Sequence, residues 1–414
     1  MQLEFGFGKT VQRVLVSDKN LLDVLTPNPV EYGLEGEAEI CRALKEPVGS
    51  SRLGEIVRPG EKIAIITSDI TRPMPTAQVM PPLLDELFAA GVKPADVTLY
   101  FALGIHRKHT VEERRKLAGE RAWSEIRCID GDVGDYESFG KTKNGTPVDI
   151  VQEVASANRR ICLGNIEYHY FAGYSGGAKA IMPGLSTHEA IQANHRLMVE
   201  ADSRAGELEK NPVRLDIEES GRMVGIDFIL NVVLDEHKRV IRAYAGDAVQ
   251  AHRAGCRFLD SIYVKQIPDL ADIVVVSQGG APKDLNLYQT QKALDNAKHA
   301  VKKGGIVILI GSCREGMGEP VFEEWMLHSE SPQSMITRIK SDFQLGGHKA
   351  AAIAMVLENA DIFLVSDMDP SFVSHIFMTP FDSAQNAFDE ALSRLGNEAT
   401  VIAMPYGGST LPRL

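Results

Sequence analysis

The chain has 414 residues, of which 44% are hydrophobic and 24% charged, and its formal net charge is −12. This is the balance of a soluble globular protein, and the chain is too long for one typical core, so we expect two or three domains. The acidic balance and the lack of a Lys/Arg cluster argue against a nucleic-acid partner. No run approaches the roughly 18 apolar residues of a membrane helix.

The five cysteines are widely spaced and form no C-x-x-C pair. A disulfide framework and a thiolate zinc site are therefore not expected. The first residues, MQLEFGFGKTVQ, lack the basic and apolar regions of a secretory signal. Together these features predict a cytoplasmic protein that does not bind a membrane.

Short apolar runs alternate with amphipathic segments along the chain, which is the pattern of α/β units. In chain order, the sequence predicts a strand at 61–69, a helix at 79–91, a strand at 96–104, a helix at 111–119, a strand at 159–165, a hairpin at 227–247, a strand at 271–280, a helix at 285–301 and strands at 304–312, 360–369 and 399–408.

This order of elements predicts two α/β lobes with an active-site cleft between them. We expect an N-terminal domain over residues 1–266 and a C-terminal domain over 267–398. For the last segment, 399–414, packing back on the N-terminal domain is one option.

The glycine-rich stretch YHYFAGYSGGAKAIMPG, residues 168–184, has part of the spacing of a nucleotide-binding P-loop. Counting from Gly173, the lysine falls correctly at Lys179. Ala178 replaces the second glycine, however, and Ala180 replaces the hydroxyl that would ligate magnesium. The sequence therefore argues against a nucleotide hydrolase.

Polar residues follow several of the predicted strands at their carboxyl ends, where ligands bind in open α/β sheets. They are Ser68–Arg72 after the first strand, His106 and Arg107 after the second, Glu167–His169 after the third, and Ser277–Gly280 with Lys283 and Asp284 in the second block. Each motif has a plain alternative: a histidine can cap a strand, Asp69 and Arg72 can form an ion pair, and Ser175–Gly177 can be a tight turn or an anion nest. Their convergence favours a functional site.

Two predicted helices carry further polar residues. Ser186–Glu189 has the spacing of a capping box, so a helix should run from about Thr187 through Met198 and place His195 on a polar face. Such a face is usually solvated, and one histidine without a partner makes no ordinary metal site. Any metal held there would take most of its ligands from a cofactor. In the second block, Tyr288, Gln289 and Lys292 share one helical face.

Taken together, SDITRP (68–73), GIHR (104–107), YHYFAGYSGGAK (168–179), NHR (194–196) and PKDLNLYQTQK (282–292) resemble the nickel-dependent lactate racemase family. The similarity extends over nearly the whole chain, and the combined set is specific although each piece alone is not. The resemblance implies a bilobed α/β enzyme that carries a nickel pincer nucleotide, a nicotinic-acid-derived mononucleotide whose sulfur and carbon atoms hold nickel.

The resemblance also implies roles for individual residues. Lys179 would form the covalent thioamide tether to the cofactor, His195 would be the protein ligand to nickel, and His106 and His169 would be the acid/base pair. The substrate-binding residues would be Arg72, Lys292, Gln289 and Tyr288, and the residues that seat the cofactor and its phosphate would be Asp69, Thr71, Ser175, Gly176 and Gly177.

The implied reaction inverts the C2 centre of a 2-hydroxy carboxylic acid. Loss of H⁻ from C2 while a base takes the hydroxyl proton avoids a dianion and gives a 2-keto acid, and return of H⁻ to the opposite face inverts the centre. Histidine suits such proton transfer near neutral pH, and an arginine fork suits the carboxylate. Other proteins would have to make and install the cofactor.

One stretch departs from the family pattern. Where lactate racemases have an aromatic residue near the substrate, the corresponding stretch here is FQLGGHKAAAI (343–353). We therefore expect a substrate side chain larger or more polar than a methyl group, with His348 or Lys349 as its contact. The sequence does not specify which 2-hydroxy acid is used. The alternative function is a protein of the same fold that senses a metabolite without catalysis.

Overall fold

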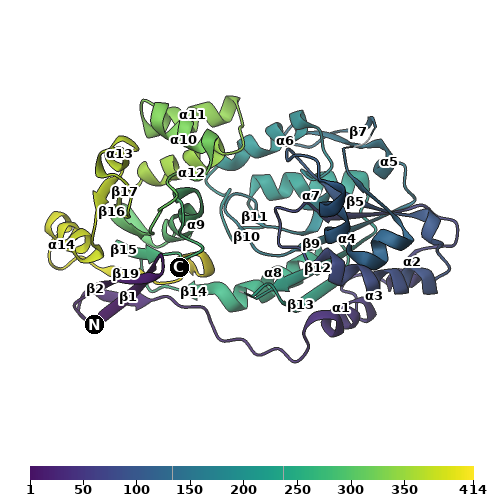
Figure 1. Ribbon diagram of the computed structural model, residues 1–414, viewed down its shortest axis with the longest axis horizontal. Coiled ribbons are helices and arrows are strands. Elements are labelled where there is room, and N and C mark those ends of the chain that lie inside the picture. Colours follow the sequence, from purple (N-terminus) through teal and green to yellow (C-terminus); the bar gives the residue numbers. More distant parts are fainter. Residues whose placement is uncertain (133, 236) are drawn as a thin grey trace. The chain divides into compact units, whose positions relative to one another are not determined.

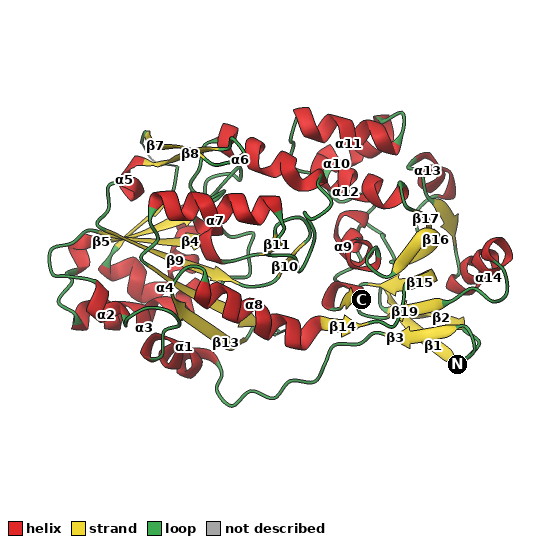
Figure 2. Ribbon diagram, turned by 180° about the vertical axis from the view of Figure 1, so that it is seen from behind, coloured by secondary structure: helices red, strands yellow, loops and turns green. Residues whose placement is uncertain are grey.

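The computed structural model describes residues 1–132, 134–235 and 237–414, and these form two compact units. The first unit is built from Met1–Pro29 together with Ser261–Leu414, and the second from Val30–Asp260. Each unit has a six-stranded sheet covered by helices (Figures 1 and 2). The predicted α/β class is therefore confirmed.

The sheet of the second unit has the strand order β13-β12-β9-β4-β5-β6, and only β13 is antiparallel to its neighbour. The predicted hairpin at 227–247 is the β12–β13 pair. The strands of this unit are β4 (Ile63–Ser68), β5 (Val97–Ala102), β6 (Arg127–Asp130), β7 (Tyr136–Lys141), β8 (Pro147–Val151), β9 (Arg159–Asn165), β10 (Tyr168–His169), β11 (Gly173–Tyr174), β12 (Phe228–Leu234) and β13 (Val240–Gly246). Its α-helices are α1 (Gly36–Lys45), α2 (Leu53–Ile56), α3 (Thr76–Ala89), α4 (Val111–Glu125), α5 (Gln152–Ala155), α6 (His188–His195), α7 (Pro212–Val224) and α8 (Gln250–Tyr263), the last of which continues into the first unit.

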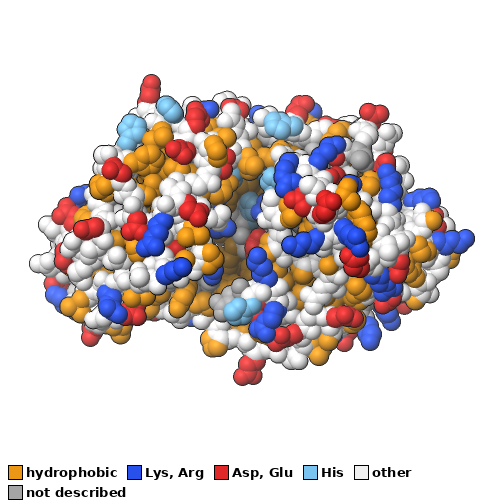
Figure 3. Space-filling view, in the orientation of Figure 1, with side chains coloured by type: hydrophobic (Ala, Val, Ile, Leu, Met, Phe, Trp, Pro, Cys, Tyr) orange, Lys and Arg blue, Asp and Glu red, His pale blue; other side chains and the backbone are white. Residues whose placement is uncertain are grey.

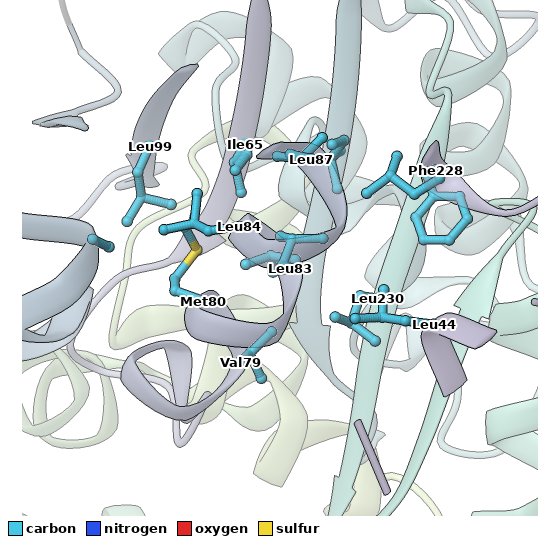
Figure 4. Packing of buried hydrophobic residues seen from close by; sticks show 14 of the residues in the cluster. Leu44, Ile65, Val79, Met80, Leu83, Leu84, Leu87, Leu99, Phe228 and Leu230 are labelled. Atoms are coloured by element: carbon cyan, nitrogen blue, oxygen red, sulfur yellow. The ribbon is translucent and has the colours of Figure 1, made fainter. Parts of the chain in front are cut away.

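Both faces of this sheet are buried, which explains why its strands are continuous apolar runs rather than alternating ones. Ile63 and Ile65 of β4 face a core formed with α1, α3 and α4, whose central side chains are shown in Figure 4. Ala64 and Ile66 face the opposite core, to which α7 and α8 contribute. The carboxyl ends of β4, β5 and β9 thus lie at one edge of a rigid layer.

The sheet of the first unit has the order β18-β17-β16-β15-β19-β3 and is parallel throughout. Helix α14 and the β1–β2 hairpin share a core with this sheet, while α9 and α12 also pack against it. The strands are β1 (Gln2–Phe7), β2 (Thr10–Leu15), β3 (Leu21–Val24), β14 (Val264–Gln266), β15 (Ala271–Ser277), β16 (Val301–Ile310), β17 (Ala360–Val365), β18 (Thr379–Phe381), β19 (Val401–Met404) and β20 (Leu411–Arg413). The α-helices are α9 (Leu287–Ala297), α10 (Pro320–His328), α11 (Pro332–Ser341), α12 (Gly347–Leu357), α13 (Pro370–His375) and α14 (Ala384–Leu395).

The two units differ from the predicted domains at both ends of the chain. Residues 1–29 do not belong with the N-terminal domain, because β3 pairs with β19 and the β1–β2 hairpin buries Phe5 and Val14 in the core of the first unit. The option that 399–414 packs on the N-terminal domain is also wrong. Its strands β19 and β20 pair with β15 and β14 inside the first unit.

Charged side chains of both signs are interspersed over the face seen in Figure 3. Within the described residues, none of the helices combines the length and apolar character needed to cross a membrane.

Candidate active site

The loop after β4 and the loop after β5 are joined by a carboxylate–imidazole hydrogen bond. Asp69 is buried, and its Oδ2 lies 2.7 Å from Nδ1 of His106. Its other oxygen accepts from the Thr71 hydroxyl at 2.9 Å. Asp69 was expected to help seat a cofactor, but both of its oxygens are engaged by these two side chains. Its observed contacts orient His106.

This hydrogen bond fixes the state of the imidazole. A carboxylate can only accept, so Nδ1 of His106 carries the proton and Nε2 is the basic nitrogen in the neutral ring. Burial alone would raise the pKa of Asp69, but hydrogen bonds from His106 and Thr71 and the charge of Arg72 outweigh it, so the pKa is lowered. Asp69 therefore stays ionised and supports His106 as a proton acceptor at Nε2.

His169 lies on the short β10–β11 hairpin, where it pairs with Gly173. The amide N–H of Ala172 donates to its Nδ1 at 3.3 Å. Nδ1 is therefore unprotonated, and the neutral ring of His169 carries its proton on Nε2. The two candidate acid/base histidines thus have opposite tautomers: His106 offers a bare nitrogen and His169 an N–H.

Four of the predicted site residues influence one another around this hairpin. The pKa of His169 is held well below its usual value by burial and then by the charges of Lys179, Arg72, His195 and Arg214. The ring of Phe171 packs edge-on against His169, with centroids 4.5 Å apart, and against His195 at 5.0 Å. The structure therefore places His169, His195 and Lys179 around Phe171, and the charge of Arg72 acts on His169.

Lys179 follows the glycine loop in a short 3-10 helix, Gly177–Ala180. Its amine lies 6.0 Å from the centroid of the Phe171 ring. Burial, together with the nearby charges of Arg72 and Arg214, holds the pKa of Lys179 well below its usual range. A neutral lysine amine is a nucleophile, so this residue is suited to covalent attachment.

The glycines before Lys179 are required by backbone conformation and packing. Gly176 and Gly177 have φ values of 77° and 60°, where residues with a side chain are strained. A Cβ on Gly176 would lie 2.7 Å from Oδ1 of Asn231. The same Oδ1 accepts the Gly177 N–H at 2.7 Å, and the Ser175 hydroxyl donates to the carbonyl of Asn165 at 2.6 Å. These donors serve the fold, and the expectation that they cradle a phosphate gains no support from them.

His195 is the last residue of α6, whose N-cap is Thr187, one residue after the Ser186 that the capping-box spacing indicated; the predicted remainder of the helix continues as a 3-10 turn, Arg196–Val199. The Thr187 hydroxyl accepts from the Ala190 N–H at 3.3 Å. His188 at the start of the helix is exposed, but His195 is buried, so the alternative of a solvated histidine is wrong for this residue. Its Nδ1 lies 3.1 Å from the side-chain oxygen of Asn194.

The candidate residues of the first unit lie on α9 and beside it. Lys292 is exposed, and Tyr288 and Gln289 are half-buried. The amine of Lys349 lies 3.8 Å from the centroid of the Tyr288 ring and donates to the Tyr288 carbonyl at 2.5 Å. His348 is buried as well and accepts the Gly346 N–H at 3.0 Å. The GGHK stretch thus lies at the start of α12, and these contacts of His348 and Lys349 are with residues of the same unit. They do not support the expected contact with a substrate.

Two buried groups behind these loops had no functional role assigned from the sequence. Nδ1 of His109 donates to Asp130 at 2.6 Å, and its Nε2 accepts the Ile70 N–H at 3.1 Å. This pair holds the loop that carries Asp69. Arg214 of α7 donates to carbonyls of the glycine loop. The only sequence signal at Arg214 is the motif NPVR, which has an asparagine at the N-cap and a proline at N1. This motif predicts the start of a helix but does not indicate which groups Arg214 binds.

A search of the described residues finds no group of three or more His, Cys, Asp or Glu side chains placed to hold a metal ion. A metal bound through His195 would therefore need other ligands from a bound group.

Comparison with known proteins gives a consistent result along the chain. The lactate racemase N-terminal domain model matches residues 7–206 and the lactate racemase C-terminal domain model matches residues 265–411. Lactate racemase from Thermoanaerobacterium thermosaccharolyticum is 32% identical over 423 residues, covering 99% of each chain. Lactate racemase from Lactiplantibacillus plantarum is 30% identical over 419 residues, covering 98% of each.

Solved structures agree with the sequence comparison. The lactate racemase apoprotein from T. thermosaccharolyticum superposes with a TM-score of 0.89 over 100% of both chains, at 32% identity. A protein from Thermotoga maritima, 18% identical, superposes with a TM-score of 0.63 over 92% of this chain and 100% of its own, which shows a shared fold. The predicted resemblance is confirmed: the chain belongs to the lactate racemase family and is an isomerase.

Proposed function

We propose that this protein interconverts the two configurations at C2 of lactate or a related 2-hydroxy carboxylic acid. The observation that carries the proposal is the packing of His169, His195 and the Lys179 amine around the Phe171 ring, with His106 held by Asp69 on the neighbouring loops. Together with Arg72, this set provides one imidazole as a base, a second imidazole whose N–H can bind the oxygen at C2, and an arginine for a carboxylate.

We infer that Lys179 and His195 hold a nickel pincer nucleotide. The residues fit such a group, because Lys179 has a buried amine with a lowered pKa, suited to a covalent bond with an acyl or thioacyl carbon. His195 offers one imidazole where the described residues provide no cluster of protein ligands, which suits a metal held mainly by its cofactor. When bound, the group supplies reversible acceptance of hydride from C2.

The protein residues then move the proton and hold the substrate. His106, whose Nδ1–H is committed to Asp69, takes the C2 hydroxyl proton at Nε2. His169, whose Nδ1 accepts from Ala172, offers an Nε2–H that donates a hydrogen bond to the oxygen at C2, and the proton returned to that oxygen is the one that His106 took. The guanidinium of Arg72 binds the carboxylate as a two-pronged donor.

The roles of Tyr288, Gln289 and Lys292 in substrate binding rest on the family resemblance of PKDLNLYQTQK. We also infer that other proteins make and load the cofactor. A cytoplasmic location is supported by the cysteines, since all five are free thiols as in proteins of reducing compartments.

The test is a panel of D- and L-2-hydroxy acids incubated with protein loaded by cofactor-making proteins, with inversion followed by chiral chromatography. We expect inversion of at least one acid and an added mass on the intact protein. Lys179→Ala should lose both. A variant that keeps inverting the substrate without the added mass would refute the proposed tether, and tight binding of an acid without inversion would favour the sensing alternative.

A further inference from the structure

The N-terminal turn of α7 faces the backbone of the glycine loop. Arg214, in this turn, is fully buried, and its guanidinium donates to the carbonyls of Ala172 at 3.1 Å, Gly176 at 3.4 Å and Tyr174. The N-cap residue Asn211 donates to the carbonyl of Phe171 at 2.9 Å. One helix start thus holds four carbonyls of a short loop, where the positive end of the helix dipole also favours them.

The remaining carbonyls of this loop are held as well. Nε2 of His252 on α8 lies 2.8 Å from the carbonyl oxygen of Ser175, and the Gly206 N–H donates to the carbonyl of Gly173 at 3.1 Å. All six carbonyls from residue 171 to residue 176 therefore have partners. Arg214 alone binds three of the six, so it is the main single support of this loop.

The same loop connects two of the residues assigned to the reaction. The Ala172 N–H donates to Nδ1 of His169, and the Gly176 carbonyl accepts the Lys179 N–H at 3.3 Å. Arg214 therefore binds the two residues, Ala172 and Gly176, whose backbones hold His169 and Lys179. We propose that Arg214 is a positioning residue that fixes His169 and the tether lysine from behind the glycine loop. The roles of those two residues rest on the proposed function.

The charge of Arg214 supports the same inference. Within the described part of the chain, its guanidinium donates to carbonyls and to no carboxylate, and Glu218, one turn along α7, is bound by Arg253 at 2.7 Å. After burial and Arg72, Arg214 is the next cause that lowers the pKa of Lys179, and it also lowers that of His169. A buried cation here favours the neutral amine, which is the form that reacts.

Two variants separate charge from shape. Arg214→Lys keeps the charge but cannot span three carbonyls, because an ammonium lacks the planar fork. Arg214→Gln removes the charge and keeps a short donor. The full-length chain without cofactor is labelled with trace acetic anhydride across a pH series, and mass spectrometry gives the labelling midpoint of Lys179. Hydrogen exchange of residues 171–178 is measured on the same samples.

We expect Arg214→Gln to raise the labelling midpoint of Lys179 by roughly one pH unit, whereas Arg214→Lys leaves it close to wild type. Both variants should exchange loop amides about tenfold faster or more, because the carbonyls lose their common donor. The control is Arg42→Gln: Arg42 donates to the carbonyl of Ala243 in the same unit at 2.9 Å, as well as to Glu39, and binds none of the loop carbonyls. It should change neither readout.

Unchanged loop exchange in Arg214→Lys would overturn the proposal, and so would an unchanged midpoint in Arg214→Gln. If Arg214→Gln fails to fold, loop exchange in Arg214→Lys decides, with Arg42→Gln as reference. The readouts need no cofactor, so they are independent of whether the wild-type protein gains the cofactor mass. Absence of that mass would instead count against the proposed function.

Discussion

The two units surround their buried and half-buried lysines in opposite ways. In the first unit, Lys349 lies over the Tyr288 ring and donates to a carbonyl, and Lys298 pairs with the buried Asp295 at 2.6 Å. In the second unit, Lys179 shares its surroundings with Arg72 and Arg214, whose charges oppose its protonation. The first arrangement stabilises the cation where it stands. The second leaves an amine that gains from losing its proton, as expected where a group is kept for chemistry rather than for the fold.

The contrast between the units predicts a reversal of sign between two lysine variants. The pKa of Lys179 is lowered in the folded chain. Below the unfolded value near 10.5, folding must therefore either remove the proton from this amine or bury its positive charge. Either change costs free energy at pH 7. Lys179→Met should therefore raise the free energy of unfolding of the cofactor-free protein, by about 1–3 kcal/mol, while abolishing cofactor attachment. Chemical denaturation and intact mass measure the two effects.

Lys349→Met is the matched control for this reversal. It removes a cation that is bound to a ring and a carbonyl, so it should lower the free energy of unfolding by about 1 kcal/mol and leave the cofactor mass in place. If Lys179→Met were destabilising like Lys349→Met, the contrast between the two units would be wrong.

Asp69→Asn tests whether the carboxylate sets the tautomer of His106. Asparagine can keep its oxygen for Thr71, which places the amide N–H₂ toward Nδ1 of His106. The proton then moves to Nε2 and the base is lost, so kcat should fall by roughly 10²–10⁴-fold with a small change in KM. Steady-state kinetics of loaded protein measure it.

Asp130→Asn is the comparison for this prediction, because Asp130 also binds Nδ1 of a histidine, His109, at 2.6 Å. There the other nitrogen accepts a backbone N–H from Ile70, so the changed tautomer leaves two donors facing each other. The main loss should be stability, by about 1–3 kcal/mol. Equal loss of kcat and unchanged stability in both variants would show that the two pairs do not differ in role.

The buried His252 predicts a pH dependence of stability. Its pKa is held well below 6.5, first by burial and then by Arg214, so below pH 6.5 the unfolded chain takes up a proton that the folded chain does not. As the pH is lowered below 6.5, this residue should lower the free energy of unfolding by up to about 1.4 kcal/mol per pH unit. His252→Gln should flatten the slope between pH 6.5 and 5, measured by denaturant titration. A measurement at pH 8 gives the change in stability that comes from the altered hydrogen bond alone. A slope between pH 6.5 and 5 equal to that of the wild type would contradict the prediction.

Local sequence signals predicted the parts of the site that lie at strand ends. Asp69, His106 and His169 were found because a parallel sheet brings the carboxyl ends of its strands to one edge. The partners of these residues were harder to predict, since Asp69 was assigned to a cofactor and in fact binds His106. Arg214 lies about 40 residues from the loop it holds, and neither its motif nor its type indicates which carbonyls it will meet. Long-range pairing also determines where residues 1–29 lie, because their strand β3 pairs with β19, some 380 residues later in the chain.

Thr71 provides the smallest and most specific test of the site. Its hydroxyl donates to Oδ1 of Asp69 at 2.9 Å, the oxygen that His106 does not use. Thr71→Ala removes one of two supports of the carboxylate without changing its charge, so the base keeps its tautomer but is less well held. We expect a fall in kcat of about 3- to 10-fold, the kinetic equivalent of one hydrogen bond, and rescue by Thr71→Ser, which restores the hydroxyl. A loss as large as that of Asp69→Asn would mean that Thr71 itself contacts the substrate or the cofactor, and failure of the serine to rescue would assign the effect to the lost methyl group.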